Sequence, residues 1–394
     1  MRTFPAGSEL LNPYPFFEDM RRNHPVAFDE QAGLWAVYRH ADVTAVLGDH
    51  QNFPTSTIEE GVLPAPEWRR LFSLNAFDPP HHTRLRNLAL RAFTPAAVAR
   101  LQAHITTIVD RLIDAVADTG RLDLVGDIAG PLPTIVIAEM LGVPAEDQEQ
   151  FRHWSDEVGE RANALVLDPE NGVRRLSEAL SPMEDYVRHA VAERRRQPKD
   201  DLMSSLLAAE IDGQSLEEPD LVAFCMLLLI AGNISTTHLI GNAIRVLLDH
   251  PDQREHFLAH PAQMPGAIEE LLRYDSPVLA APRWIRHDYE LGGMKLQRGQ
   301  RVICWLGAAN RDPEAFPDPD RLDLTRKAAR QVSFGHGAHY CMGAPLARLE
   351  ARIALPAILQ RLPELTLVEG TQLEPVPGYL LHGMVKMPME FKPA

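Results

Sequence analysis

The three cysteines of the chain differ in their surroundings, and one of them lies where a thiol can act chemically. Cys225 and Cys304 lie inside apolar runs, where a buried and inert thiol is expected. Cys341 follows a glycine-rich stretch and precedes an amphipathic segment, so it lies at a predicted loop-to-helix junction. The partial positive charge and free amide groups of a helix N-terminus lower the pKa of a thiol and stabilise its anion. Cys341 is therefore a candidate thiolate ligand for a soft or borderline metal.

The stretch 333–343 reads SFGHGAHYCMG, and its glycines allow a backbone to approach a flat ligand without clashes of Cβ atoms. Two other interpretations stay open at this point. One is a glycine-rich turn with an incidental buried cysteine. The other is zinc, held by His336, His339 and Cys341, which would need a fourth ligand or a water. Paired cysteines and a His-x-x-x-His helix, which would support zinc, do not occur nearby.

Helices must position these residues, because apolar side chains recur three and four apart over most of the chain. This periodicity predicts helices over 96–117, 148–158, 176–195, 219–248 and 261–274. Short strand-like segments occur at 26–28, 34–38, 289–291, 301–305 and near the C-terminus. No repeat, linker or low-complexity tract interrupts the sequence, so we expect a single domain over 1–394 that is mainly α with small β-sheets.

The predicted helix 219–248 would be roughly 45 Å long, and its middle, 231–237, reads AGNISTT. These residues are poor helix formers, so packing alone does not explain them. Hydroxyl groups and a glycine inside a core helix indicate a widened groove or a ligand contact. The segments 52–80 and 311–337 are rich in Pro, Asp and Gly and are predicted to be long functional loops.

The composition argues against several classes of partner. The chain has 394 residues, of which 54 are acidic and 39 basic, and its net charge of -15 disfavours binding to nucleic acid or to an anionic membrane. The segment 1–13 lacks the apolar run of a signal peptide, and the apolar stretch 221–230 is too short to cross a bilayer. We expect a cytoplasmic protein.

The stretch around Cys341 resembles the haem-binding signature of the cytochrome P450 family, Phe-Gly-x-Gly-x-His-x-Cys-x-Gly, and matches every fixed position. The resemblance covers nearly the whole chain and is closest to the soluble bacterial type. It implies a triangular helical prism with haem b between the long central helix and the cysteine loop. Cys341 would be the axial ligand of the iron, and Phe334 and Gly343 would contact the cofactor.

Other segments resemble the same family in the expected order. Glu270 and Arg273 match its Glu-x-x-Arg motif, and the resemblance makes Arg321 the third member of a buried charge network. The residues implied to bind the haem propionates are His82, Arg86, Arg283 and His339.

The middle of the long helix resembles the oxygen-binding groove of the family, with one departure. Ile234 stands where an acid is common, and Ser235 stands where a threonine is common. Ser235 and Thr236 are therefore the candidate catalytic hydroxyls. Because the acid is missing, we also hypothesise partial use of peroxide.

The resemblance implies a monooxygenase that inserts one oxygen atom from O2 into an apolar molecule of the fatty acid, terpenoid, steroid or polyketide type. Its implied pocket walls are Leu227, Ala231, Leu279 and Leu380, with 52–80 as a lid. No Gly-x-Gly-x-x-Gly motif follows a strand, so electrons would come from a ferredoxin or flavodoxin with an NAD(P)H reductase, docking near Arg86 and Arg348. The alternatives are a haem-based sensor without turnover and a zinc protein.

Overall fold

The computed structural model describes residues 1–55, 73–90, 93, 95–162, 169–211, 214–327 and 330–393. The chain forms two compact units. The first contains 1–53, 102–132 and 235–394, and the second contains the described residues of 54–101 and 133–234.

A four-stranded sheet organises the first unit. Its order is β1 (Val26–Asp29), β2 (Leu34–Val37), β9 (Arg301–Trp305) and β6 (Ala280–Trp284). The pair β2 and β9 is parallel, with Leu34 opposite Arg301, whereas the other two pairs are antiparallel. Parallel neighbours need a long connection, which explains why a strand near residue 35 pairs with one near residue 303.

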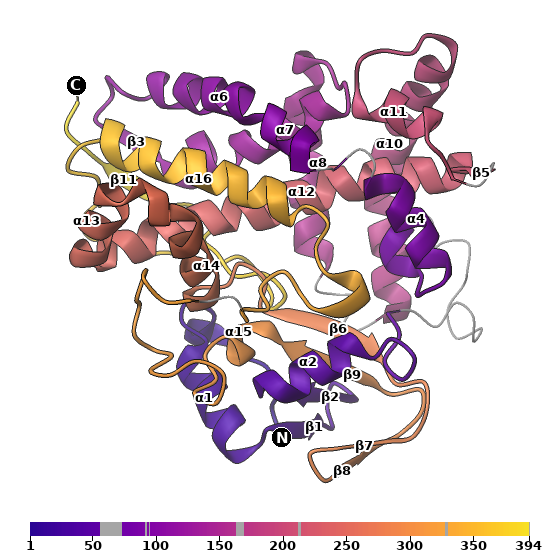
Figure 1. Ribbon diagram of the computed structural model, residues 1–394. Coiled ribbons are helices and arrows are strands. Elements are labelled where there is room, and N and C mark those ends of the chain that lie inside the picture. The colour runs from indigo at the N-terminus through magenta and orange to yellow at the C-terminus, as the bar shows by residue number, and fades with distance from the viewer. Residues whose placement is uncertain are drawn as a thin grey trace. The chain divides into compact units, whose positions relative to one another are not determined.

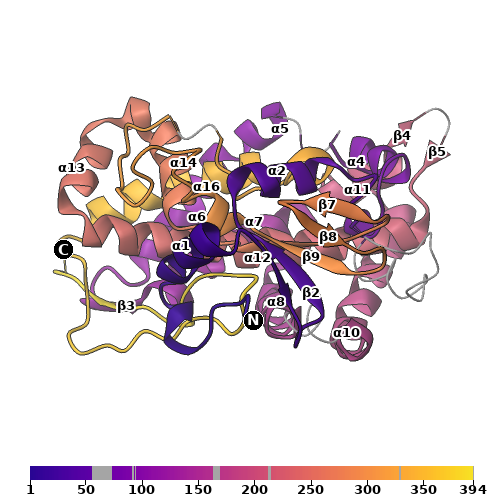
Figure 2. The same ribbon diagram turned by 90° about the horizontal axis from the view of Figure 1, so that it is seen from below.

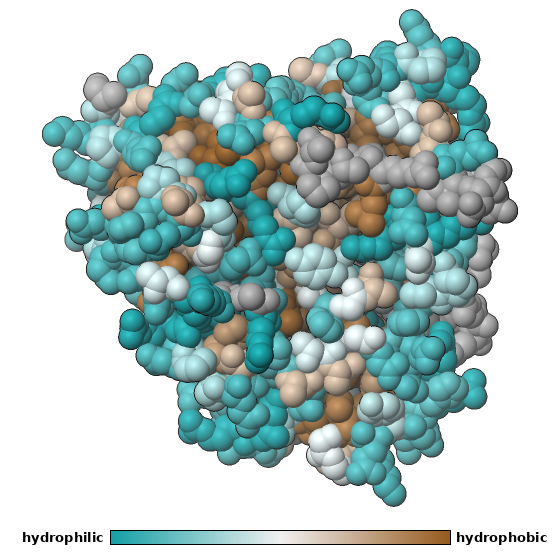
Figure 3. All heavy atoms as spheres, in the orientation of Figure 1, coloured by the Kyte–Doolittle hydropathy of each residue, from teal (hydrophilic) through white to brown (hydrophobic). Residues whose placement is uncertain are grey.

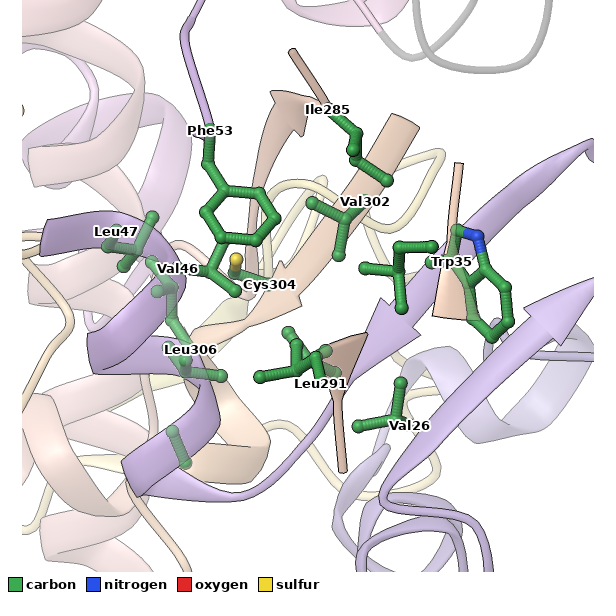
Figure 4. Close-up of a cluster of buried hydrophobic side chains, with 14 of the residues drawn as sticks. Val26, Trp35, Val46, Leu47, Phe53, Ile285, Leu291, Val302, Cys304 and Leu306 are labelled. Carbon is green, nitrogen blue, oxygen red and sulfur yellow. The ribbon is translucent and has the colours of Figure 1, made fainter. Parts of the chain in front are cut away.

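Apolar side chains on this sheet form a closed core cluster, shown in Figure 4. Trp35, Val302 and Cys304 contribute from the strands, while Leu47 and Phe53 come from α2 (His40–Gly48) and the segment after it. All five side chains are at most 6% exposed. Cys304 therefore has the buried setting that its apolar neighbours predict, and burial raises the pKa of its thiol to about 12.

Helices make up most of the remaining first unit. They are α1 (Tyr14–Asn23), α6 (Gln102–Asp114), α13 (Pro251–Ala259), α14 (Met264–Tyr274), α15 (Leu306–Ala309) and α16 (Ala344–Arg361). Its short elements are η1 (Gly7–Leu10), β3 (Arg121–Asp123), η4 (Leu124–Ala129), η6 (Pro261–Gln263), β7 (Tyr289–Leu291), β8 (Met294–Leu296), η7 (Gly337–His339), β10 (Thr366–Leu367) and β11 (Pro388–Glu390). Helix α16 packs on α6 and α14, and Figure 2 shows α2 beside β9.

The second unit is almost entirely helical. It contains η3 (Ser73–Ala76), α4 (His81–Leu90), α5 (Pro95–Arg100), most of α7 (Pro131–Met140), η5 (Ala145–Asp147), α8 (Gln148–Ala162), α10 (Pro169–Arg196), α11 (Leu202–Ala208), β4 (Glu210–Ile211) and β5 (Gln214–Ser215). Helices α8 and α10 pack together through aromatic contacts, in which the rings of Phe151 and Tyr186 lie 4.9 Å apart.

Helix α12 (Glu218–Asp249) has 32 residues and contains the whole range 219–248 that periodicity assigns to one long helix (Figure 1). It continues through the poor helix formers of 231–237 without a break. A Cβ atom on Gly232 would lie 3.3 Å from the Ile137 side chain, so glycine permits this approach. The helix is long and apolar enough to cross a membrane, yet 67% of its most apolar window is buried, as in a core helix.

The fold class predicted from periodicity, mainly α with small sheets, is confirmed. Over the described part of 311–336 the chain forms neither helix nor strand, in agreement with the predicted long loop. Most of the other predicted loop, 56–72, lies outside the described residues. Hydrophilic residues cover most of the face drawn in Figure 3, as the net charge of -15 leads one to expect.

Candidate haem-thiolate site

The cysteine loop is a compact turn that ends at the start of α16. The backbone N–H of Cys341 donates to the carbonyl of Phe334 at 2.8 Å. Gly335 and Gly337 have φ angles of 76° and 73°, which favour glycine. A Cβ atom on Gly337 would also lie 2.7 Å from the Leu47 carbonyl oxygen, so this glycine is needed for two reasons.

The thiol of Cys341 is exposed, whereas Cys225 and Cys304 are buried. It lies close to Gly343, the N-cap of the 18-residue helix α16, since a Cβ atom built there would be 3.9 Å from Sγ. The helix terminus therefore offers its partial positive charge to a thiolate at this position. Burial raises the pKa of Cys225, as of Cys304, to about 12, which keeps both protonated.

A buried polar cluster ties the start of this loop to α14. The Nδ2 group of Asn310 donates to the hydroxyls of Ser276 and Ser333, both at 2.8 Å, and its Oδ1 accepts from the N–H of Val332. Ser333 Oγ also donates to the carbonyl of Leu272 at 2.8 Å. These bonds fix the chain two residues before the glycine turn, so the cysteine loop starts from a rigid base.

Arg348 supports the other end of the loop. Its guanidinium donates to both carboxylate oxygens of Glu269, at 2.5 and 3.0 Å, and to the hydroxyl of Tyr340 at 3.2 Å. It also lies 4.5 Å from the centre of the Phe334 ring. The sequence suggested Arg348 as a docking contact, and the structure shows that it joins α14, α16 and the cysteine loop. Its side chain remains 32% exposed.

Glu270 and Arg273 form a doubly hydrogen-bonded ion pair at 2.7 and 2.8 Å, and both side chains are fully buried. Arg273 also donates to the carbonyls of Asn310 and Pro319.

The prediction that Arg321 completes this network with its side chain is wrong. That side chain is 68% exposed and lies 3.6 Å from Asp323. The guanidinium that reaches Glu270 belongs to Arg326, at 3.0 Å, and Arg321 contributes only its carbonyl oxygen. Both arginines lie in an irregular loop, where no periodicity tells which side chain turns inward, so sequence spacing could not identify Arg326.

The residues expected at the propionates lie in different units. In the second unit, His82 and Arg86 lie about one turn apart on α4. His82 is 1% exposed. In the first unit, Arg283 is 8% exposed on β6 and donates to the Pro282 carbonyl, while His339 lies in η7.

Helix α12 presents an incompletely covered stripe. Leu227, Ile234 and Ser235 are half-buried and Ala231 is exposed, and their spacing of three and four places them on one side of the helix. Thr236 is 4% exposed and points away from this stripe. The stripe is apolar except for the Ser235 hydroxyl.

The two other predicted wall residues lie together in the first unit. The N–H of Leu279 donates to the carbonyl of Leu380 at 2.8 Å. Leu279 is 1% exposed and faces Gly307, so its side chain belongs to the core, whereas Leu380 is half-buried.

The donor set fits a haem better than zinc. An exposed thiol at a helix N-terminus, beside glycines that leave the approach open, suits a flat cofactor. Within the described residues, no group of three His, Cys, Asp or Glu side chains is placed to hold a metal ion. His336 instead lies near Gly48 of α2.

The chain matches the family model of cytochrome P450 over residues 28–257 and 263–392. It is 38% identical to "Cytochrome P450 109" of Bacillus spizizenii, covering 99% of this chain and 94% of that protein. It is also 38% identical to the vitamin D(3) 25-hydroxylase of Pseudonocardia autotrophica, with coverage of 98% and 96%. The crystal structure of CYP109E1 from Bacillus megaterium in complex with testosterone is similar as well, with a TM-score of 0.84, 35% identity and coverage of 97% and 99%.

The chain belongs to the cytochrome P450 family. It is a haem b monooxygenase, and its relatives include a hydroxylase by name. A zinc protein and a sensor without turnover are therefore set aside.

Proposed function

We propose that this monooxygenase hydroxylates a steroid-sized apolar molecule at a carbon held against the α12 stripe. The observation that carries the proposal is the stripe itself, in which Leu227, Ala231 and Ile234 offer apolar surface beside one hydroxyl, that of Ser235. A surface of this kind binds hydrocarbon rings and has no charged group to recognise a polar substrate. The vitamin D(3) hydroxylase and the testosterone complex among the similar proteins support the steroid class.

Cys341, in this proposal, holds the haem iron as a thiolate that the N-terminus of α16 stabilises. The bound haem supplies the redox chemistry that activates O2. Phe334 and Gly343 line the cofactor on the cysteine side, and the propionates are held by His82, Arg86, Arg283 and His339. The protein then has three tasks: to orient the substrate, to exclude water and to supply protons.

Ser235 is the proposed proton-donating hydroxyl, because it is half-buried on the open stripe. Thr236 is buried and points away from the stripe, so it has a supporting role. The stripe carries Ile234 where an acid would titrate, so protons must arrive by another route or with the oxidant. A contribution of peroxide as oxidant therefore belongs to the proposal.

Electrons are proposed to come from a ferredoxin or flavodoxin with its NAD(P)H reductase, which would dock on the cysteine side near Arg86 and Arg348. We further propose a soluble cytoplasmic protein in which both compact units belong to a single domain. Leu380 is kept as a wall of the substrate pocket. Leu279 is proposed to support that wall from the core.

The test is an optical titration of the ferric holoprotein with testosterone, vitamin D3, palmitate and erythromycin. We expect the steroids to shift the iron toward high spin and to give a mono-oxygenated product with a surrogate ferredoxin, its reductase and NADPH. Hydrogen peroxide in place of the donors measures the peroxide contribution. A high-spin shift and product with palmitate or erythromycin alone would contradict the steroid class.

A pocket variant sharpens this test. Ala231→Phe fills the open stripe and should weaken testosterone binding by about tenfold or more, since one bulky group costs a few kcal/mol of fit. Imidazole, a small ligand of the iron, serves as the matched control and should bind as it does to the unaltered protein. Equal losses for both ligands would show that the variant damages the haem site instead of the pocket.

A further inference from the structure

One face of α12 carries a buried polar column beyond Ser235. His238, Asn242 and Arg245 follow it at spacings of three, four and three residues, which places all four on one side of the helix. His238 and Asn242 are 6% and 1% exposed. The side chain of Arg245 is 26% exposed. An apolar side chain would be expected at the buried positions of a core helix, so the two polar residues there call for a reason.

Each of the three side chains has a buried polar atom without a hydrogen-bond partner among the described residues. These atoms are His238 Nδ1, Asn242 Oδ1 and Arg245 Nε. A buried polar atom left unpaired is destabilising, and buried water is the usual partner in such places. The column therefore has the chemistry of a site for several ordered waters.

The far end of the column reaches solvent through charged groups. Arg245 donates to Asp275 Oδ2 at 2.6 Å and lies 3.7 Å from Asp249, whose side chain is 61% exposed. Asp275 Oδ1 accepts from the hydroxyl of Tyr14 at 3.0 Å and lies 3.0 Å from His382 Nε2. The column thus extends along the helix from a surface acid to the turn that carries Ser235.

The chain makes room for His238 at the inner end of this column. A Cβ atom on Gly383 would lie 2.3 Å from His238 Nδ1, so only glycine fits there. Burial and the neighbouring His382 lower the pKa of His238 to about 4, so the imidazole is neutral at physiological pH. A neutral imidazole has one nitrogen that accepts a proton and one that donates a proton.

We propose that His238 relays protons from solvent to Ser235 along this column, in place of the acid that Ile234 replaces. The proposal rests on the proposed role of Ser235. In each transfer, one nitrogen of His238 gains a proton from a water as the other nitrogen releases one toward Ser235. The net charge of the ring is unchanged but its tautomer is reversed, and proton exchange with water restores the first tautomer before the next transfer. The insertion of one oxygen atom from O2 takes up two protons and two electrons, and both protons come from solvent by this route. His238 is a positioning residue that acts through Ser235.

The first measurement needs no turnover. Histidine labelled with 15N is incorporated into the holoprotein, which is studied in its diamagnetic ferrous, carbon-monoxide-bound state, and the His238 signal is assigned by its loss in His238→Gln. We expect the ring N–H to exchange with water much faster than the backbone amides of α12. An N–H as protected as those amides would overturn the proposal.

The second measurement uses testosterone, a surrogate ferredoxin with its reductase, and NADPH. Loss of a general acid or base commonly costs a factor of 10² to 10⁴, so His238→Phe should lower product formed per NADPH by roughly tenfold or more. His238→Gln should be equally poor, because an amide forms hydrogen bonds but does not relay protons readily. The matched control, His260→Gln at an exposed position, should be unchanged.

Two results separate this proposal from the proposed function. Hydrogen peroxide brings its own protons, so peroxide-driven product formation should survive in His238→Phe, which also shows that the variant folds and binds haem. Full coupling in His238→Gln would reduce His238 to a hydrogen-bonding role and overturn the relay. If the unaltered protein oxidises no steroid, the proposed function fails, whereas the exchange rate of the ring N–H still decides the relay.

Discussion

Glu270 accepts a hydrogen bond from Arg326 at 3.0 Å, five residues beyond the arginine that sequence resemblance assigns to this contact. Glu270 is fully buried, and Arg326 is 14% exposed. A buried carboxylate between two guanidiniums needs both of them, because either loss leaves charge poorly compensated in the core. We therefore expect the network of Glu270 and Arg273 to be less stable without Arg326.

Replacement of Arg326 tests this network. Arg326→Leu should lower the free energy of unfolding of the holoprotein by about 3 kcal/mol, because it removes a partner of a buried charge. Arg321→Leu is the matched control and should change it by less than about 0.5 kcal/mol, since its side chain is exposed. Denaturant unfolding of both variants gives the comparison. Equal losses in the two variants would contradict the assignment.

The stability of the protein should depend on the ionisation of Glu350 between about pH 4.5 and 8. This carboxyl group is 1% exposed in α16, and burial raises its pKa to about 8 from an ordinary value of 4.5. The folded state thus keeps a proton that the unfolded state releases, so stability falls as pH rises from about 4.5 to 8.

Glu350→Gln removes this penalty and should raise the free energy of unfolding near pH 8 by up to about 5 kcal/mol, with no gain near pH 4. Thermal unfolding across this pH range measures the effect. Glu369→Gln, at an exposed position, is the control and should follow the unaltered protein. A gain that is the same at every pH would show that packing, not ionisation, is responsible.

A titratable group beside Ser235 should improve the use of electrons. Ile234→Asp places a carboxylate one residue before Ser235 on the half-buried stripe, and we expect more product per NADPH than in the unaltered protein. Ile234→Asn has a similar shape without the proton and should give no gain. Ile234→Asp should also restore coupling when it is combined with His238→Phe, if the new carboxylate and His238 serve the same proton route. Unchanged coupling in both backgrounds would mean that protons reach the site elsewhere.

The long helices and short strands could be predicted because periodicity is a local property. The 3.6-residue pattern located α8, α12 and α14, and apolar alternation located β1, β2 and β9. Periodicity merged α5 and α6 into one helix, although the chain turns between Arg100 and Gln102. Strands β3 and β6 were not predicted as strands, because β3 has only three residues and β6 contains Pro282, so neither shows a clear strand pattern.

The cysteine loop could be predicted for a different reason, since its glycines and Cys341 are contiguous in sequence. The residues that support the loop could not be predicted from the sequence. Arg348 and Glu269 are 79 residues apart, and Asn310 joins Ser276 to Ser333 across three segments. The polar column of α12 has a visible spacing, but its burial against Gly383 and Asp275 becomes evident only in the folded chain.

Cys341 is proposed to bind the haem iron as a thiolate. Cys341→Ala should abolish the monooxygenase activity, whereas Cys304→Ala, a buried thiol with a raised pKa, should retain it. The most direct measurement is the carbon monoxide difference spectrum of the reduced protein. We expect the red-shifted thiolate band for the unaltered protein and Cys304→Ala, and its loss in Cys341→Ala. A thiolate band that persists in Cys341→Ala, or its absence from the haem-loaded unaltered protein, would contradict the claim.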